Sequence, residues 1–352
     1  MITFIFYAVF GFFLSFFLAF IVRRVAIHFN IIDKPSSIPK KIHAKPVAQL
    51  GGIAIYLSIA LITVFLLLSG NFLTSGTITS YHYLGVLLGG LILMIGGFLD
   101  DCYELPPQTA IIAPILAAFT TISFGIEVTK LTNPFGGVFL LETWQSDILV
   151  FVWLMIVMYT TKFLDGLDGL ATSVSGIGVL MIFLLSLTAT YYQPDVGLLA
   201  SVVLGSYLGF LIWNIHPASI FLGEGGSVFV GYMLGILAVI SGGKVATALL
   251  VLGIPLLDVL WIMSRRFREG GITRIFQGDK KHLHHRLLKL GWGQTTIVMM
   301  YVAIASAFGV SALFLQSRQK IIALLILSLV MGLLAFVLVQ KDRQGERMLE
   351  KV

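Results

Sequence analysis

Two carboxylates stand where a long apolar run of this sequence ends. The segment Lys162–Leu170 reads KFLDGLDGL and holds Asp165 and Asp168 three residues apart, at the point where hydrocarbon would meet water. Ionisable groups at such depth cost free energy, so an intramembrane carboxylate is first read as part of a functional site. The glycines beside them permit backbone conformations closed to other residues and the close approach of a ligand.

Three further polar clusters stand at the ends of other apolar runs: Asp100–Asp101, Gly223–Ser227 (GEGGS) and His282–Arg286 (HLHHR). Carboxylate oxygens suit Mg²⁺, which keeps water molecules and shares the phosphates of a substrate. Adjacent aspartates point in different directions from a helix, so one can be a ligand and the other a base. Glu224, among glycines before a helix start, can reach a metal whose phosphate partner is held by backbone N–H groups.

The histidines lack the HExxH spacing of a zinc site. Beside Lys280, Lys281 and Arg286, His282, His284 and His285 are more typical of a diphosphate clamp, because charge-assisted hydrogen bonds to phosphate are strong. Each cluster also has a plainer interpretation. The aspartates could be solvated helix ends or part of a glycine-rich turn, Ser227 could be a helix cap, and the histidines could belong to a basic helix on lipid headgroups.

The composition places the chain in a bilayer. Hydrophobic residues make up 58% and charged residues 11% of the 352 residues, and the mean hydropathy is +0.98. A soluble chain of this size could not hide so much apolar surface. At roughly 20 residues per crossing, the sequence predicts an all-α polytopic membrane protein of eleven helices, over residues 3–22, 48–68, 83–99, 108–125, 146–164, 169–189, 197–213, 226–241, 244–263, 294–315 and 320–340.

The basic residues predict the orientation. The loops after the first and ninth spans and the C-terminal tail carry six, eight and four Lys and Arg residues, whereas the opposite side carries four. Because positive loops stay in the cytoplasm, we expect the N-terminus outside and the C-terminus inside. All four polar clusters then face the cytoplasm. We expect one membrane domain over residues 1–340, a short cytoplasmic tail over 341–352, and a multi-pass protein of the cell membrane.

The net charge of +6 suits an anionic inner leaflet and anionic substrates. No basic stripe interleaved with aromatic residues indicates nucleic-acid binding, and the single Cys102 excludes an intramolecular disulfide. Carboxylates with Mg²⁺ activate and clamp phosphates, and cations stabilise a leaving nucleotide. The residues therefore indicate phosphoryl transfer from a nucleotide-activated donor to an acceptor in the membrane.

Two other classes compete with this interpretation. A transporter or lipid flippase without transferase activity would place charges near the bilayer midplane, often within repeats, whereas here the charges gather at one face. An intramembrane aspartyl protease needs two aspartates on facing helices, typically with a GxGD element, and GFLDD does not fit that pattern.

Taken in order, the motifs resemble a known family. They are HAKPVAQLGGIAIY from His43, GFLDD, DGLDGLA, NIHPA with FLGEGGS, PLLD before Arg265–Arg266, and HLHHRLLKLG. This set is similar to the polyprenyl-phosphate N-acetylhexosamine-1-phosphate transferases, glycosyl transferase family 4, over about residues 1–340. The histidine loop resembles the undecaprenyl-phosphate N-acetylglucosamine-1-phosphate branch more than the related phospho-N-acetylmuramoyl-pentapeptide transferases.

The resemblance implies a reaction at the cytoplasmic face that begins a cell-envelope polysaccharide. Undecaprenyl phosphate would attack the β-phosphorus of a UDP-HexNAc, giving a lipid-diphosphate sugar and UMP, with Mg²⁺ or alternatively Mn²⁺. It further implies that Asp100 and Asp101 lie by the lipid phosphate, one of them as base, with Asp165 at the reaction centre and as a metal ligand. A homodimer is left open.

The remaining implied roles concern the donor and the metal. Glu224 would bind the metal, and His284, His285 and Arg286 would hold the diphosphate, with His282 and His43 also in contact with substrate. Asp168, Asn214 and Phe221 would line the uridine side.

Three positions depart from the family pattern: Glu224 replaces an Asp, Lys162 replaces an Asn, and Ala110 replaces a Lys. Because Lys162 is three residues before Asp165 and on the same helix face, we expect its ammonium to pair with Asp165 and the substrate diphosphate. That arrangement would replace the charge missing at position 110 and give Lys162 a catalytic role.

Overall fold

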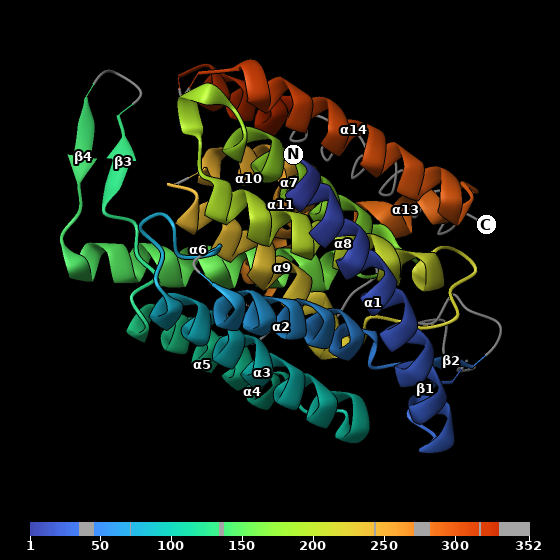
Figure 1. The fold of residues 1–352 in the computed structure, drawn as a ribbon. Coiled ribbons are helices and arrows are strands. Elements are labelled where there is room, and N and C mark those ends of the chain that lie inside the picture. The colour runs from blue at the N-terminus through green and yellow to red at the C-terminus, as the bar shows by residue number, and fades with distance from the viewer. Residues whose placement is uncertain are drawn as a thin grey trace.

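The apolar runs of the sequence form helices, and the computed structural model confirms the all-helical, multi-pass architecture (Figure 1). The structure describes residues 1–34, 46–70, 72–133, 137–242, 244–270, 282–316 and 318–330. In chain order the helices are α1 (Ile2–His28), α2 (Gly51–Ser69), α3 (Ser80–Tyr103), α4 (Pro107–Ala110), α5 (Ile112–Ser123), α6 (Thr143–Leu164), α7 (Leu170–Ser186), η1 (Ala189–Tyr191), α8 (Pro194–Asn214), α9 (Gly223–Ile240), α10 (Val245–Val251), α11 (Gly253–Gly270), α13 (Leu283–Lys289) and α14 (Gln294–Phe314).

Two short antiparallel hairpins complete the described elements. β1 (Ile32–Asp33) pairs with β2 (Val47–Ala48), and β3 (Lys130–Thr132) pairs with β4 (Val138–Leu140). The backbone of Ala48 also bridges to Ile220, and the Phe221 N–H donates to the Ala48 carbonyl at 2.8 Å. The segment before α9 is therefore fastened to the segment before α2.

Each predicted span overlaps a helix of the structure, with ends that differ by up to several residues. Within the described residues seven helices are long and apolar enough to cross a bilayer, or eight if α10 and α11 form one broken span. The apolar helices Pro107–Ser123 and Leu170–Ser186 are shorter. Of the predicted span 320–340, the described part up to residue 330 is helical.

The predicted span over residues 244–263 is not one straight helix, because α10 and α11 meet at an angle of 78°. The break falls at Leu252, and Pro255 stands in the first turn of α11. Proline lacks a backbone N–H and clashes with the preceding turn, so it is tolerated where a helix begins and not where one continues. The uninterrupted hydropathy of this stretch hid the break.

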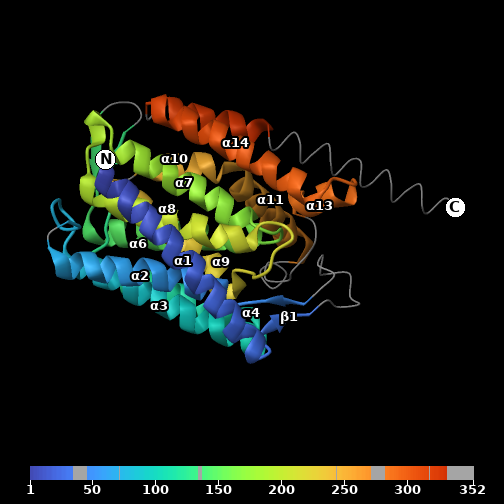
Figure 2. The same ribbon diagram turned by 45° about the vertical axis from the view of Figure 1, so that its right-hand side comes forward.

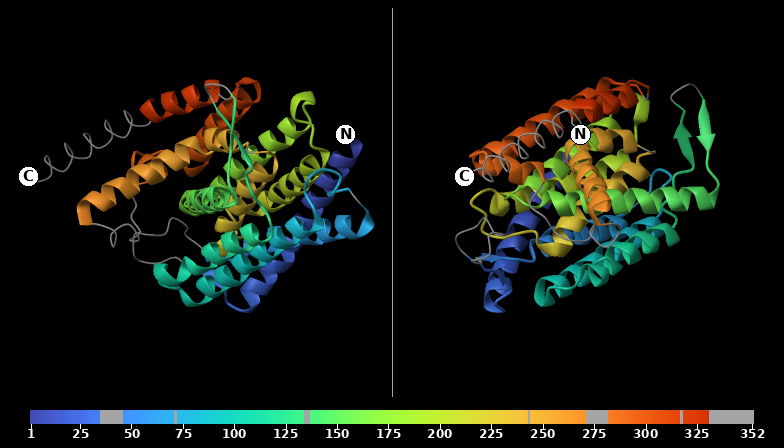
Figure 3. Two further views of the ribbon diagram at one scale, coloured as in Figure 1. Left: turned by 90° about the vertical axis from the view of Figure 1, so that its left-hand side faces the viewer. Right: turned by 180° about the vertical axis from the view of Figure 1, so that it is seen from behind.

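Helix α9 is the centre of the bundle. It is apolar on all sides, and 83% of its apolar window is buried, compared with 22% for α1. Figures 2 and 3 show α9 surrounded by other helices while α1 lies at the edge. A helix that is apolar all round belongs in such an interior. The exposed phenylalanines of α1, Phe6, Phe13 and Phe17, face the place where lipid would lie.

Two side chains within the bundle donate hydrogen bonds to backbone carbonyls, the kind of pairing that a bilayer favours. The indole of Trp153 donates to the Gly235 carbonyl at 3.0 Å, and the Tyr207 hydroxyl donates to the Val230 carbonyl at 2.8 Å. Both acceptors are on α9. These bonds fix the central helix against α6 and α8.

Close glycine contacts set the position of the α9 N-terminus. A Cβ on Gly52 of α2 would collide with the Gly226 backbone, and one on Gly97 of α3 would collide with the Gly225 backbone. The first turn of α9 is thus held between α2 and α3 with backbone against backbone. This packing brings Glu224 to the end of α3, where Asp100 and Asp101 lie.

The chain crosses back and forth so that one end of the bundle collects the polar clusters. The ends of α1, α3, α6 and α11 and the starts of α2, α7, α9 and α14 meet there, with β1 and α13 beside them (Figure 2). The β3–β4 hairpin stands at the opposite end, before the start of α6 (Figures 1 and 3). The elements that carry the predicted site therefore share one end.

We predict that Gly52→Ala lowers stability by about 1–3 kcal/mol, the usual cost of forcing atoms into a packed interior. The new methyl group would meet the backbone of Gly226, which cannot swing aside. Thermal unfolding in detergent measures the effect. Gly176→Ala in α7 is the matched control, because its methyl would make only an ordinary contact with Tyr207, and alanine favours a helix. Equal unfolding midpoints for the two variants would contradict the prediction.

Candidate functional site

A cavity of about 730 Å³ opens at this end of the bundle. Its walls come from segments far apart in the sequence, and its size suits a ligand with tens of non-hydrogen atoms. The predicted residues that line it are Asp101, Lys162, Asp165, Asp168, Asn214, Phe221, Glu224 and His285. A second cavity of about 1100 Å³ adjoins it and is lined by Asp100. Asp33, Gln49, Asp101 and Glu224 line both cavities.

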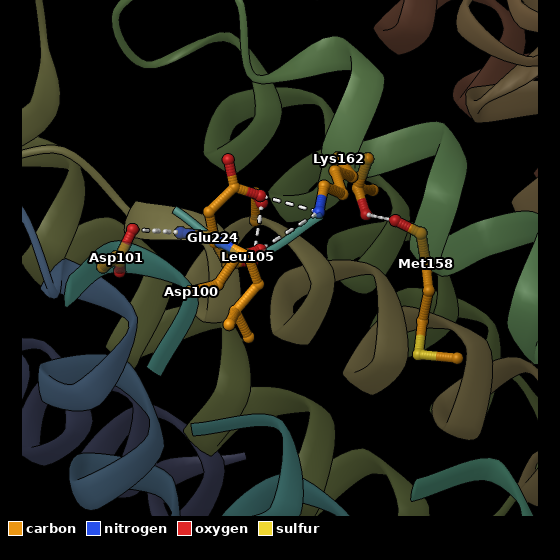
Figure 4. A network of polar contacts seen from close by, with 8 residues as sticks. Asp100, Asp101, Leu105, Met158, Lys162 and Glu224 are labelled. Carbon is orange, nitrogen blue, oxygen red and sulfur yellow. Dashed lines mark hydrogen bonds and ion pairs between the residues drawn. The ribbon is translucent and has the colours of Figure 1, made fainter. Parts of the chain in front are cut away.

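The two aspartates that end α3 have different partners. Asp101 accepts a hydrogen bond from the backbone N–H of Glu224 at 3.0 Å (Figure 4), so it satisfies a free donor at the start of α9. Asp100 accepts from the Leu105 N–H at 2.9 Å and so closes its own turn. Asp101 binds the start of α9, and Asp100 turns toward Lys162.

Lys162 is the cation at the centre of the carboxylates. Its ammonium lies 2.7 Å from Glu224 Oε2 and 3.9 Å from Asp100 Oδ2 (Figure 4). The expected pairing with Asp165 is not among the ion pairs of the described residues. The helical spacing argument failed because α6 ends at Leu164 and Asp165 has left the helical conformation, with ψ of 42°.

Asp165 directly follows the end of α6 and lines the cavity. Burial raises the pKa of this carboxyl to about 8, and the carboxylates of Glu224 and Asp168 act in the same direction. A carboxyl in such surroundings ionises readily only when a cation comes close. Asp165 is therefore suited to a ligand or substrate that brings positive charge.

Asp168 forms a small network with the NIHPA loop, in which no role was predicted for His216. Its Oδ2 lies 2.7 Å from His216 Nδ1 and accepts the Ala218 N–H at 3.1 Å. His216 precedes a cis peptide bond to Pro217, and both residues line the cavity. His216 is thus a candidate site residue that sequence reasoning missed.

Asn214 is buried, and its side chain serves the fold as well as the cavity wall. Its amide donates to the Ile220 carbonyl at 3.0 Å. The bond closes the loop of residues 215–219, which carries His216 and ends beside Phe221. Phe221, implied for the uridine side, lines the same cavity.

The predicted histidine clamp forms a row of rings beside the end of α6. His282 stacks on Phe163, with ring centroids 5.6 Å apart, and on His284 at the same distance. His284 contacts His285, with centroids 4.3 Å apart. The row begins at α6 and ends at the cavity, where His285 forms part of the wall.

The three histidines are not equivalent. His284 is only 2% exposed, and burial, aided by the neighbouring imidazoles, lowers its pKa well below the ordinary value. Its ring is therefore neutral at pH 7, and Nε2 faces the backbone of Gly166. Of the predicted clamp residues, His285 alone lines the cavity, and Arg286 is partly exposed on α13. His43 and the basic residues Arg274, Lys280 and Lys281 lie outside the described residues.

The charges of the cavity wall bear on metal binding. The described lining includes five carboxylates, from Asp33, Asp101, Asp165, Asp168 and Glu224, and one lysine. In the described part of the chain no three His, Cys, Asp or Glu side chains are arranged to hold a metal ion by themselves. Mg²⁺ needs only one or two protein carboxylates when water and substrate phosphates complete its shell, so the oxygen donors present fit that ion.

Known proteins were compared with the whole sequence. The family model for glycosyl transferase family 4 matches residues 83–242. The probable undecaprenyl-phosphate N-acetylglucosaminyl 1-phosphate transferase of Bacillus subtilis is 30% identical over 87% of this chain and 83% of its own length.

Two further relatives extend the comparison. The decaprenyl-phosphate N-acetylglucosaminephosphotransferase of Mycobacterium leprae is 32% identical over 80% of this chain and 77% of its own length. The phospho-N-acetylmuramoyl-pentapeptide-transferase of Geobacillus thermodenitrificans is 28% identical over 76% of this chain and 83% of its own length. Residues 83–242, which the family model matches, include Asp100, Asp101, Asp165, Asp168 and Glu224.

We predict that Lys162→Met raises the affinity of the empty site for Mn²⁺ at least tenfold. The ammonium repels a dication and competes for Glu224, and two unit charges about 5 Å apart interact by roughly 3 kcal/mol at an effective dielectric constant of 20. Electron paramagnetic resonance of free Mn²⁺ measures the binding. Lys244→Met, which removes a buried lysine far from the cavity, should leave the affinity unchanged. Equal affinities for wild type and Lys162→Met would contradict the prediction.

Proposed function

The chain belongs to glycosyl transferase family 4, and from that membership we propose that it transfers an N-acetylhexosamine-1-phosphate from a UDP-sugar to a polyprenyl phosphate, releasing UMP. The names of its relatives favour UDP-N-acetylglucosamine as donor and undecaprenyl phosphate as acceptor. The observation that carries the proposal is the convergence of four distant polar clusters on one cavity. The same observation favours a transferase over a transporter or flippase, because the charged residues gather at one end of the bundle.

We assign the donor to the cavity of about 730 Å³. We assign the uridine to Asp168, Asn214 and Phe221, near the loop that carries His216. We assign the diphosphate to the side of Lys162 and His285, which present the cationic and hydrogen-bonding groups of the described lining. The reacting β-phosphorus then lies near Asp165.

The acceptor phosphate is assigned to the end of α3. An oxygen of the lipid phosphate attacks the β-phosphorus, the bond from that phosphorus to the bridging oxygen breaks, and UMP leaves. A phosphate monoester has a second pKa near 6, so its last proton must be absent for attack. Asp100 or Asp101 is placed to accept that proton, and proton acceptance by a positioned base is worth about 10²–10⁴ in rate.

The five carboxylates create a problem for an anionic donor, because Lys162 is the single lysine of the described lining and is already paired. We propose that Mg²⁺, held by Asp165 and Glu224, supplies the missing charge. When bound, a divalent ion neutralises phosphate oxygens and stabilises the charge of the leaving nucleotide. The residues of the chain then orient the two phosphates and exclude water between them.

We also propose the membrane arrangement that the charge bias predicts. The eleven spans, the outer N-terminus and the inner C-terminus would place the cavity at the cytoplasmic face of the cell membrane. Nucleotide sugars are found in the cytoplasm, so a cavity at this face would meet the donor. The polyprenyl chain of the acceptor would stay in the bilayer. The basic loops would then face the anionic inner leaflet.

The reaction can be tested directly with the purified full-length protein. Incubation with UDP-N-acetylglucosamine, undecaprenyl phosphate and MgCl₂ should give UMP and a lipid-linked sugar in equal amounts. Omission of either substrate should abolish both products. UMP formation without a lipid product would show hydrolysis, and no UMP with any UDP-HexNAc would refute the transferase.

We predict that Asp165→Asn and Glu224→Gln each reduce turnover at least ~10²-fold, the usual effect of losing a positioned charge in a reaction centre. Exhaustive EDTA treatment should do the same, and added Mg²⁺ should restore turnover of the wild type. Asp195→Asn is the matched control, because Asp195 is a buried carboxylate that lies away from both cavities. Wild-type turnover after EDTA would refute the metal assignment.

The orientation has its own test. In a Cys102→Ser background, a cysteine at Tyr103 or Leu290 should react only with a reagent applied to the cytoplasmic side. A cysteine at Leu140 should react only from outside. All three side chains are more than 60% exposed, so access does not limit labelling. Labelling of Tyr103→Cys and Leu290→Cys from opposite sides would exclude a single cytoplasmic site.

A further inference from the structure

Asp258 is a carboxylate of α11 to which no role has yet been assigned. Its Oδ2 lies 2.8 Å from His282 Nδ1, and its Oδ1 accepts the Leu283 N–H at 3.0 Å. The side chain is 12% exposed in the apolar first part of the helix. A charge in such a place is costly unless it is paired, and here both oxygens have partners.

Three contacts fix the position of the His282 ring. Asp258 holds Nδ1, Phe163 stacks on the ring with an interplanar angle of 25°, and His284 stacks with an angle of 10°. Phe163 directly follows Lys162 in α6. His282 is therefore the point at which α11, α6 and the histidine row meet.

The row of histidine rings connects His282 to the cavity. His284 contacts the backbone of Gly166 in the turn between Asp165 and Asp168, and it contacts the His285 ring. Helix α13 has seven residues, too few to be stable without external contacts. The contacts of His282 and His284 thus help to set the orientation of His285. The partner of His282 in one of these contacts is the carboxylate of Asp258.

We propose that Asp258 is a positioning residue for the diphosphate of the donor. It accepts the Nδ1 proton of His282 and the first N–H of α13, and so holds His285 in the cavity wall. A carboxylate bonded to one ring nitrogen fixes both the tautomer and the orientation of an imidazole. This inference rests on the proposed transferase function, because it assigns His285 to the donor.

The test is Asp258→Asn in the full-length protein. The amide keeps the shape of the carboxylate but offers a weaker acceptor. We expect the Kd for UDP, measured by isothermal titration calorimetry, and the KM for the UDP-sugar to rise at least about tenfold, since small misplacements of binding groups cost that much or more. The KM for polyprenyl phosphate and the thermal midpoint should stay at wild-type values.

A double-mutant cycle separates positioning from a general loss of structure. His282→Phe keeps the stacked ring but loses Nδ1, so Asp258→Asn combined with His282→Phe should weaken UDP binding no further than either change alone. Asp258→Glu, which keeps the charge, should recover part of the affinity. Asp195→Asn, a buried carboxylate elsewhere in the bundle, should leave UDP binding unchanged.

Two results would overturn the proposal: wild-type UDP affinity in Asp258→Asn, or equal losses for both substrates together with a lower thermal midpoint. The proposed function fails separately. A wild-type protein that binds UDP but transfers no sugar phosphate would refute the reaction and leave the binding test of Asp258 intact. A wild-type protein that does not bind UDP would refute both.

Discussion

Repulsion between carboxylates that share one end of an apolar bundle is the constraint on which this structure depends. Asp100, Asp101, Asp165 and Glu224 are close enough for their charges to interact, and low polarity strengthens that repulsion. The fold offsets it in several ways. The ammonium of Lys162 lies between Glu224 and Asp100, Asp101 accepts a backbone N–H at the positive end of α9, and burial favours the neutral form of Asp165. What remains is a demand for positive charge, which a divalent metal ion would meet.

That arrangement requires the start of α9 to come very close to α2 and α3. Gly52 and Gly97 permit it, because any side chain there would meet the backbone of Gly226 or Gly225. The two hydrogen bonds from Gly51 and Gly52 to the carbonyls of Phe221 and Leu222 fix the same contact from the other direction. The glycines of the GEGGS motif therefore serve the approach of helices, while Glu224 among them serves the cavity. One motif carries both the packing and the chemistry.

Much of this could be predicted from the sequence. Hydropathy located the helices, and the alternation of spans with the positions of the basic residues indicated that the four clusters share one end. The partner of Lys162 could not be predicted, because local spacing pointed to Asp165 while the true partner, Glu224, belongs to a helix that only tertiary packing brings near. Hydropathy also did not reveal the break between α10 and α11, because it shows that a stretch is apolar and not in which direction its helices run. His216 and Asp258 stand in the NIHPA and PLLD motifs, but neither was given a role, because a single titratable residue has no spacing that indicates its chemistry. Pro217 and the PLLD segment were the available signals.

A buried charge is not by itself a site, and the opposite end of the bundle shows the difference. Lys244 is 9% exposed, donates to Gln193 at 2.9 Å and lies over the ring of Tyr191. Asp195 is also buried nearby, against Gly76. Lys244 is thus paired within the bundle, and neither group lines one of the two large cavities. Around Glu224 the charges have partners too, but they face a space large enough for a nucleotide sugar. It is the combination of an unbalanced carboxylate group with an adjoining cavity, and not burial or charge alone, that distinguishes the candidate site from the opposite end of the bundle.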